Sequence, residues 1–318
     1  MIPGSQFAHL RLRFAREEWN VGVLSQPVED VVRGGIRTPI RWWRSCGAWE
    51  MLADPSCLID SNGTRIIFAE RLDYRTGRGE IWAARVPATK DLAEVRLEPW
   101  MRSRCHLSYP RPVIGPTGCL FFTAETAETG ALHLWRRVGN SLVHVGPIIR
   151  EPILDPTLYH DGTTWWLFCT SRRSGPNERL LLFYADRLEG PWTAHPRNPV
   201  KIDPGSSRPA GPLIWVDGRL IRPAQDCSYT YGGELILNQV TRLDKDGYGE
   251  AVVRRLKPGA VYPDGLHTLC PAGDVTLIDG KRWSFRKADV LRKVIVSLFR
   301  RTRPLFRPGV PLQIMFPT

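Results

Sequence analysis

The chain has 318 residues, 42% of them hydrophobic and 10% aromatic, so it can bury a large core without a disulfide or metal staple. Its net charge of +12 favours anionic partners such as phosphates, nucleotides or an anionic membrane face, with solubility alone as the plainer alternative. No stretch approaches the about 20 apolar residues of a membrane span, and the N-terminus lacks the apolar run of a signal peptide. Seven cysteines without a CxxC pair predict a reducing compartment with no disulfide framework and no zinc site. We expect a cytoplasmic protein without a cofactor.

Hairpin turns recur along the chain at intervals of roughly 45–60 residues, a period typical of propeller repeats. Residue pairs such as Asn-Gly and Asp-Gly favour these turns because both residues tolerate positive φ. The five turns that we expect are Asn62-Gly63, Thr117-Gly118, Asp161-Gly162, Asp217-Gly218 and Asp279-Gly280.

Short apolar segments lie on both sides of each expected turn. Those before it are residues 57–59, 112–114, 157–159, 213–216 and 275–278. Those after it are residues 66–68, 120–122, 165–168, 220–221 and 283–285. Third strands are expected at 81–84, 132–135, 181–184 and 235–238, and weaker fourth strands at 143–145 and 251–253. Continuous apolar runs indicate strands buried on both faces, and four strands per unit are typical of a propeller blade.

The pattern therefore predicts an all-β chain that folds as a five-bladed β-propeller over residues 1–287. The fifth unit ends near Lys287 without an outer strand, so we expect residues 19–23 to close the ring by pairing with the last blade and to hide the open sheet edges. The alternative is a two-sheet β-sandwich with irregular turns.

Residues 288–318 form a separate basic tail. Apolar side chains at helical spacing over 288–301 predict a short amphipathic helix, and prolines then enforce an extended end. Such a helix is expected to lie on the anionic inner face of the membrane. The alternative is that it docks on the outer wall of the propeller.

Acidic residues recur where the expected blades meet the central axis. The first strand of a blade lines the axis, and Asp54 and Asp155 each precede a proline at the start of such a strand. Glu70 and Glu125 end two second strands. Turn-forming aspartates and solvated glutamates are the simpler explanation of each residue alone. Because glycosidic bond cleavage uses a pair of carboxyl groups, we take all four as candidate catalytic residues.

Polar and aromatic side chains surround these carboxyl groups in the expected blades. Such side chains suit sugars, which offer CH faces and hydroxyl rims, although each aromatic residue alone is also a common core residue. The candidate substrate-binding residues are His106, Tyr109, Arg208, Gln225, Asp226, Tyr231 and His267. Ser108 and His267 lack the nucleophile-elbow sequence that would indicate a Ser-His-Asp catalytic site. No nucleic-acid-binding motif accompanies the net positive charge.

Several motifs together resemble a known family. They lie at residues 18–22, 53–55, 108–110, 123–126, 155–157, 165–168, 190–196, 208–211, 222–227, 231–232 and 265–268. From about residue 17 to about residue 285, the chain resembles the N-terminal domain of plant glucosamine inositolphosphorylceramide transferase and its free-standing bacterial relatives. The resemblance implies a five-bladed propeller of the glycoside hydrolase family 43 and 32 type.

The same resemblance implies roles for individual residues. Asp54 matches the general base or nucleophile of blade one, and Asp155 matches the third-blade aspartate that tunes acidity. The general-acid glutamate of family 43 lies on a later blade, where this chain offers Gln225 and Asp226 instead. Glu125 is then the substitute acid.

The sequence supports two main function hypotheses and a third alternative. The first is a carbohydrate-active enzyme that hydrolyses or transfers a glycosyl unit of a glycan or glycolipid. The second is a non-catalytic glycan-binding module that serves a partner glycosyltransferase. The third is a basic protein–protein scaffold, since propellers often serve as platforms.

Overall fold

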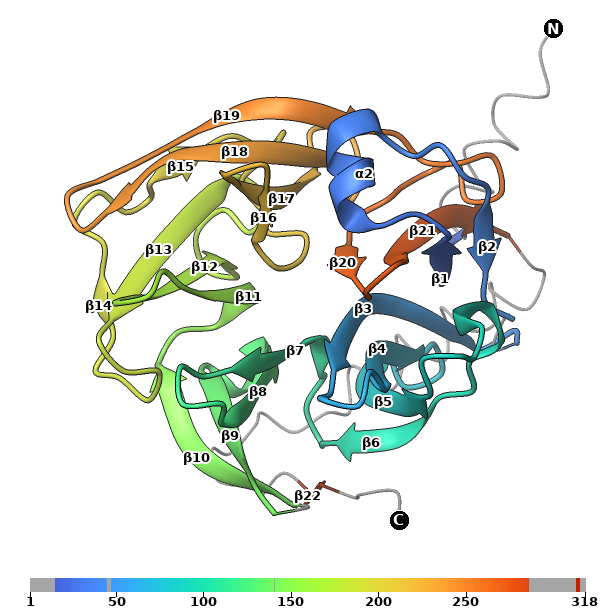
Figure 1. Ribbon diagram of the computed structural model, residues 1–318, viewed down its shortest axis with the longest axis horizontal. Coiled ribbons are helices and arrows are strands. Elements are labelled where there is room, and N and C mark those ends of the chain that lie inside the picture. Colours follow the sequence, from blue (N-terminus) through green and yellow to red (C-terminus); the bar gives the residue numbers. More distant parts are fainter. Residues whose placement is uncertain (1–14, 45–46, 140, 286–312, 315–318) are drawn as a thin grey trace, which may run out of the picture.

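The computed structural model describes residues 15–44, 47–139, 141–285 and 313–314. Five antiparallel sheets surround a common centre (Figure 1). The predicted five-bladed β-propeller is therefore confirmed.

Four blades follow one another along the chain. Blade one contains β3 (Glu50–Ile59), β4 (Arg65–Asp73), β5 (Arg78–Val86) and β6 (Glu98–Arg102), with β22 (Gln313–Ile314) paired to β6. Blade two contains β7 (Ser108–Ile114), β8 (Leu120–Glu125), β9 (Leu132–Val138) and β10 (Ser141–Ile149). Blade three contains β11 (Ile153–His160), β12 (Trp165–Ser171) and β13 (Arg179–Ala185), with β14 (Thr193–Ala194) and β15 (Lys201–Ile202) both paired to β13. Blade four contains β16 (Ile214–Val216), β17 (Arg219–Asp226), β18 (Glu234–Asp244) and β19 (Gly247–Leu256). Short 3₁₀ helices lie at Leu92–Glu94 and Ala127–Thr129.

Blade five joins the two ends of the described propeller. It contains β20 (Leu269–Pro271), β21 (Thr276–Ser284), β1 (Arg16–Leu24) and β2 (Ile40–Trp42). β1 pairs with β21 along its whole length, from Arg16 opposite Ser284 to Leu24 opposite Thr276. The N-terminal strand thus closes the ring as predicted, and no hydrogen-bonding edge is left open between β1 and β21.

Four of the five predicted turns lie where the sequence places them, and the fifth prediction was wrong. Asp279 and Gly280 lie inside β21, opposite Val21 and Asn20 of β1. The hairpin of blade five turns earlier, at residues 272–275, where Gly273 adopts a φ of +78°. Position 280 requires a glycine because a Cβ there would collide with the Trp42 ring, and not because the chain turns.

One helix was not predicted. α2 (Val28–Gly34) follows β1 and packs beside blades four and five (Figure 1). Its buried valines at 28, 31 and 32 join a cluster with Ile221, Leu256 and Leu269. Arg254 of β19 donates to the Val32 carbonyl oxygen at 2.8 Å, which fixes the helix against blade four. The helix therefore covers the seam next to the ring closure.

The helix expected over 288–301 lies outside the described residues, so the domain boundary at 287, the membrane-face alternative and the cytoplasmic location stay predictions. Within the part of the chain that the structure describes, no helix has the length and apolar character to cross a bilayer. β22 places residues 313–314 opposite Met101 and Arg102 of β6, so this piece of the tail extends blade one.

Candidate functional site

The innermost strands of blades one to three share a bulge next to a proline. Pairing with the second strand shifts register between Ala53 and Ser56, between Ser108 and Arg111, and between Leu154 and Thr157. At each bulge the residue before the proline has positive φ: Asp54 at 52°, Tyr109 at 47° and Asp155 at 48°. Gly211 precedes Pro212 in blade four with a φ of +134°. A non-glycine residue in this region is strained, and such strain often accompanies a functional site.

The bulges turn backbone amides toward side chains of a neighbouring blade. The four hydrogen bonds run from Asp54 N to Asp279 Oδ2 (2.9 Å), Tyr109 N to Asp54 Oδ2 (3.1 Å), Asp155 N to Glu125 Oε2 (3.2 Å) and Gly211 N to the Tyr109 hydroxyl (2.7 Å). This relay ties all five blades at the axis and holds the carboxyl groups of separate blades in one buried cluster.

Asp54 and Asp279 flank His267. His267 Nδ1 donates to Asp279 Oδ1 at 2.7 Å, and its Nε2 lies 3.6 Å from Asp54 Oδ1. The ring stacks on Trp19 with centroids 3.9 Å apart. Burial lowers the pKa of His267, but the charges of Asp279 and Asp54 outweigh it, and the pKa is raised. Burial raises the pKa of Asp54, and the charge of His267 opposes that rise. An imidazolium between two carboxylates is the protonation state that this geometry favours.

Asp279 is the functional residue that the sequence did not reveal, because it was assigned to a turn. Its side chain is fully buried and accepts four hydrogen bonds. The available signal was an acidic residue that ends an apolar run, 275–278, as Glu70 and Glu125 end theirs. Ligand atoms of Asp54, His267 and Asp279 lie within 4.8 Å of one another, a spacing that suits a cation. Because donors already occupy both Asp279 oxygens, a metal there would have to displace hydrogen bonds.

Asp155 and Glu125 occupy contrasting surroundings. Asp155 Oδ2 accepts from Arg208 Nε at 2.6 Å and from Gln225 Nε2 at 2.8 Å. The Arg208 guanidinium lies over the Tyr231 ring, 4.8 Å from its centroid. Among the residues that the structure describes, no cation forms an ion pair with Glu125: burial, with the charge of Asp155, raises its pKa to about 8 against the opposing charge of Arg208. Glu125 therefore holds its proton at neutral pH beside a carboxyl group that is paired with Arg208.

Glu70 is a second carboxyl group kept neutral. Its Oε1 is buried without a hydrogen-bond partner among the described residues, and His106 Nε2 lies 3.4 Å away. His106 Nδ1 accepts from the Gly79 amide at 3.0 Å, so Nε2 carries the ring proton. Burial, with the charge of Asp54, raises the pKa of Glu70 well above its usual range. Burial also lowers the pKa of His106, so both groups are neutral here.

Two predicted ligand-binding residues have other contacts. Tyr109 is fully buried, and its hydroxyl lies 2.8 Å from Thr157 Oγ1, while Arg111 lies over its ring. Tyr109 therefore fills the axis instead of facing a ligand. Asp226 accepts from Arg255 Nη1 at 2.9 Å and is not brought into the cluster. The remaining predicted residues, on blades one to five, do lie in or beside it: Asp54, Glu70, His106, Glu125, Asp155, Arg208, Gln225, Tyr231 and His267.

Comparison with known proteins agrees with this geometry. Residues 44–257 match the family model described as glucosamine inositolphosphorylceramide transferase 1, N-terminal. The chain belongs to this family. It is 30% identical over 253 residues to glucosamine inositolphosphorylceramide transferase 1 of Oryza sativa subsp. japonica, covering 73% of this chain and 33% of that protein. The Arabidopsis thaliana transferase of the same name is 30% identical over 265 residues, covering 74% and 34%. The chain thus spans about a third of the length of the curated relatives that it matches.

Solved structures share the fold of this family member. A family 117 glycoside hydrolase of Zobellia galactanivorans has a TM-score of 0.51 at 12% identity, covering 82% of this chain and 97% of that one. An exo-β-1,3-galactanase of Clostridium thermocellum has a TM-score of 0.50 at 13% identity, covering 68% and 53%. These likenesses show the propeller fold.

Proposed function

We propose that this domain is an enzyme that acts on a glycosyl unit of a glycan or glycolipid at the axial carboxyl groups. One observation carries the proposal: carboxyl groups from separate blades are buried together in contrasting electrostatic environments. Burial and Asp155 raise the pKa of Glu125 to about 8, whereas the charge of His267 opposes the rise that burial causes in the pKa of Asp54. Pairs of carboxyl groups with separated pKa values are typical of acid–base chemistry.

The roles follow from these environments. Glu125 is the general acid that gives its proton to the oxygen of the departing group as the glycosidic bond breaks. Asp54 is the base that takes a proton from the attacking water or acceptor hydroxyl, or else the nucleophile that bonds to the anomeric carbon. Asp155, fixed by Arg208 and Gln225, orients the sugar and raises the pKa of Glu125.

A glycolipid is the substrate class that fits the comparisons and the charge. The relatives are named for transfer to inositolphosphorylceramide, a phosphorylated lipid. The net charge of +12 is complementary to a phosphate-bearing substrate. Because the relatives are about three times as long, the remainder of their chains could supply the transfer step, and this domain the recognition of the glycan.

Gln225 supports that second candidate, a glycan-binding module that serves a glycosyltransferase. The resemblance to family 43 hydrolases leads us to expect a general-acid glutamate on this blade. The Gln225 amide donates to Asp155 instead and has no proton to give to a leaving group.

Paired variants separate the two candidates. Asp54→Asn and Glu125→Gln keep size and shape, and Asp226→Asn is the matched control outside the cluster. Turnover is measured on nitrophenyl glycosides and on inositolphosphorylceramide glycolipids, and binding is measured by calorimetry. We expect a roughly 10²–10⁴-fold loss of turnover in both cluster variants, with binding retained. Full activity in both would reject the enzyme, and saturable binding without any product from the unaltered protein would establish the module.

A further inference from the structure

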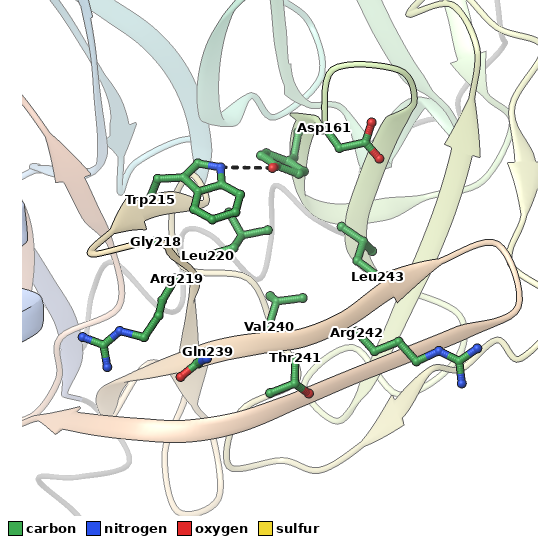
Figure 2. Close-up of a pocket in the computed structure, with 11 residues that line it drawn as sticks. Asp161, Trp215, Gly218, Arg219, Leu220, Gln239, Val240, Thr241, Arg242 and Leu243 are labelled. Atoms are coloured by element: carbon green, nitrogen blue, oxygen red, sulfur yellow. Dashed lines mark hydrogen bonds between the residues drawn. The ribbon is translucent and has the colours of Figure 1, made fainter.

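A concave site lies on the propeller, away from the axial cluster. It is a cavity of about 260 Å³ between blades three and four (Figure 2). β11 runs from Asp155 in the cluster to Tyr159 at the cavity, and four residues of strand span roughly 13 Å. The lining side chains used below are Tyr159, Trp215, Arg219, Leu220 and Gln239.

Trp215 is the main feature of this cavity. It is 59% exposed, although it belongs to the innermost strand of its blade. Its Nε1 donates to the Tyr159 hydroxyl at 3.1 Å, a bond that joins the two blades (Figure 2). The indole is thus fixed and its N–H is satisfied, so it presents an aromatic surface to solvent. A large aromatic side chain that is both exposed and anchored suits stacking against the CH face of a sugar.

A hydroxyl group lies at the edge of this aromatic surface. Tyr159 accepts the hydrogen bond from Trp215 and keeps its own proton to donate. Leu220 is paired with Trp215, so it lies on the same face of blade four and contributes an apolar wall. Gln239 is paired with Ile221 and Arg219 with Val216, so these two polar side chains lie on the opposite face of the blade from the Trp215 ring. An apolar surface with a few polar groups is the usual composition of a ligand site.

The size of the cavity limits its occupant. Sites for drug-sized ligands measure about 300–1,000 Å³, so 260 Å³ suits one ring instead of a nucleotide or a larger cofactor. We propose that this pocket binds a single sugar ring of a glycan, which stacks on Trp215 and hydrogen-bonds to the Tyr159 hydroxyl. A glycan bound at this pocket is held on the protein, which raises the local concentration of the rest of the glycan at the protein surface. The proposal does not depend on chemistry at the axial cluster.

Ligand-observed NMR tests the site with methyl glucoside, methyl galactoside, N-acetylglucosamine and glucuronic acid at millimolar concentrations. Trp215→Ala removes the stacking surface, and Trp283→Ala, which removes an indole that is 42% exposed on blade five, is the matched control. We expect affinity for at least one sugar to fall about tenfold in Trp215→Ala, because stacking contributes on the order of one factor of ten, and to stay unchanged in the control. Tyr159→Phe, which removes the hydroxyl and keeps the Trp215 ring, should weaken binding less.

A crystal soaked with the sugar that binds best locates the ligand. Electron density for one ring on Trp215 supports the proposal. Density only at the axial cluster, equal affinity of Trp215→Ala and the unaltered protein, or no binding of any of the four sugars would each overturn it. Because the Trp215→Ala variant leaves the axial residues intact, loss of this site and loss of axial activity are separate results.

Discussion

Glu125→Gln should make the protein more stable while removing its activity. Glu125 is 9% exposed, and its pKa is raised from 4.5 to about 8. The unfolded chain loses this proton near pH 4.5, whereas the folded protein keeps it until about pH 8. The raised pKa of an acid therefore costs stability that grows as pH rises between these values and is absent below pH 4.

The magnitude follows from the pKa difference. One pKa unit corresponds to about 1.4 kcal/mol, so Glu125 lowers the free energy of unfolding by about 5 kcal/mol at pH 8, an upper value because its neighbours titrate with it. Glutamine keeps the shape of the neutral acid, and its carbonyl oxygen can accept from the Asp155 amide as Oε2 does. We expect the variant to melt about 6–10 °C higher at pH 8 and at the same temperature at pH 4.

Thermal and urea unfolding from pH 4 to pH 8 supply the measurement. The difference between the two proteins reports Glu125 together with the neighbours that titrate with it, because more distant titrating groups are common to both. Equal stability of the two proteins at every pH would show that Glu125 is ionised in the fold and would remove the general acid from the proposed mechanism. A less stable variant at pH 8 would contradict the same reasoning.

Three further substitutions test the axial relay by urea unfolding. Asp279→Asn places an amide N–H against a backbone donor and should cost about 2–4 kcal/mol, whereas Asp217→Asn in an exposed turn should stay within about 0.5 kcal/mol. Gly211→Ala would drive a Cβ into the Leu269 carbonyl oxygen and should cost more than about 3 kcal/mol; Gly218→Ala, with positive φ and open space, should cost about 1 kcal/mol. Tyr109→Phe leaves the buried Gly211 amide without its acceptor and should cost about 1–3 kcal/mol with the fold kept. Equal costs within either matched pair, or no cost for Tyr109→Phe, would show that the relay carries little energy.

Sequence patterns predicted the ring because each blade repeats one local rule. A tight turn between two apolar runs specifies a hairpin wherever both flanking strands are buried, and four of five such turns lie as expected. The rule failed at Asp279-Gly280, where the glycine provides room for Trp42 of a strand more than 230 positions earlier. Contacts between residues so far apart in the sequence leave no local signal. Helix α2 was missed for the same reason, because its valines pack against blades four and five, and the sequence does not show that these blades lie beside it.

The site was only partly predictable because its chemistry depends on contacts between blades. Aspartate before proline indicated Asp54 and Asp155, while the aromatic side chain of Tyr109 suggested a ligand contact. Only the structure shows that the Tyr109 ring fills the axis and that its hydroxyl bonds to blades three and four. The sequence also does not show that Glu70 and Glu125 are protonated, because their protonation depends on whether the fold places a cation beside them.

Charge balance connects these observations. Among the described residues, the cluster holds three cations, Arg111, Arg208 and the His267 imidazolium, which face Asp54, Asp155 and Asp279. Burying an unpaired charge is far more costly than protonating a carboxyl group, so the two glutamates, which lack a cation of their own, stay neutral. Gln225 fits the same balance: a glutamate in its place would bring a further carboxyl group against Asp155, where the amide instead donates a hydrogen bond. The amide of Gln225 on blade four and the high pKa of Glu125 on blade two therefore both reflect one limit on buried negative charge, and that limit supports the proposal of Glu125 as the acid.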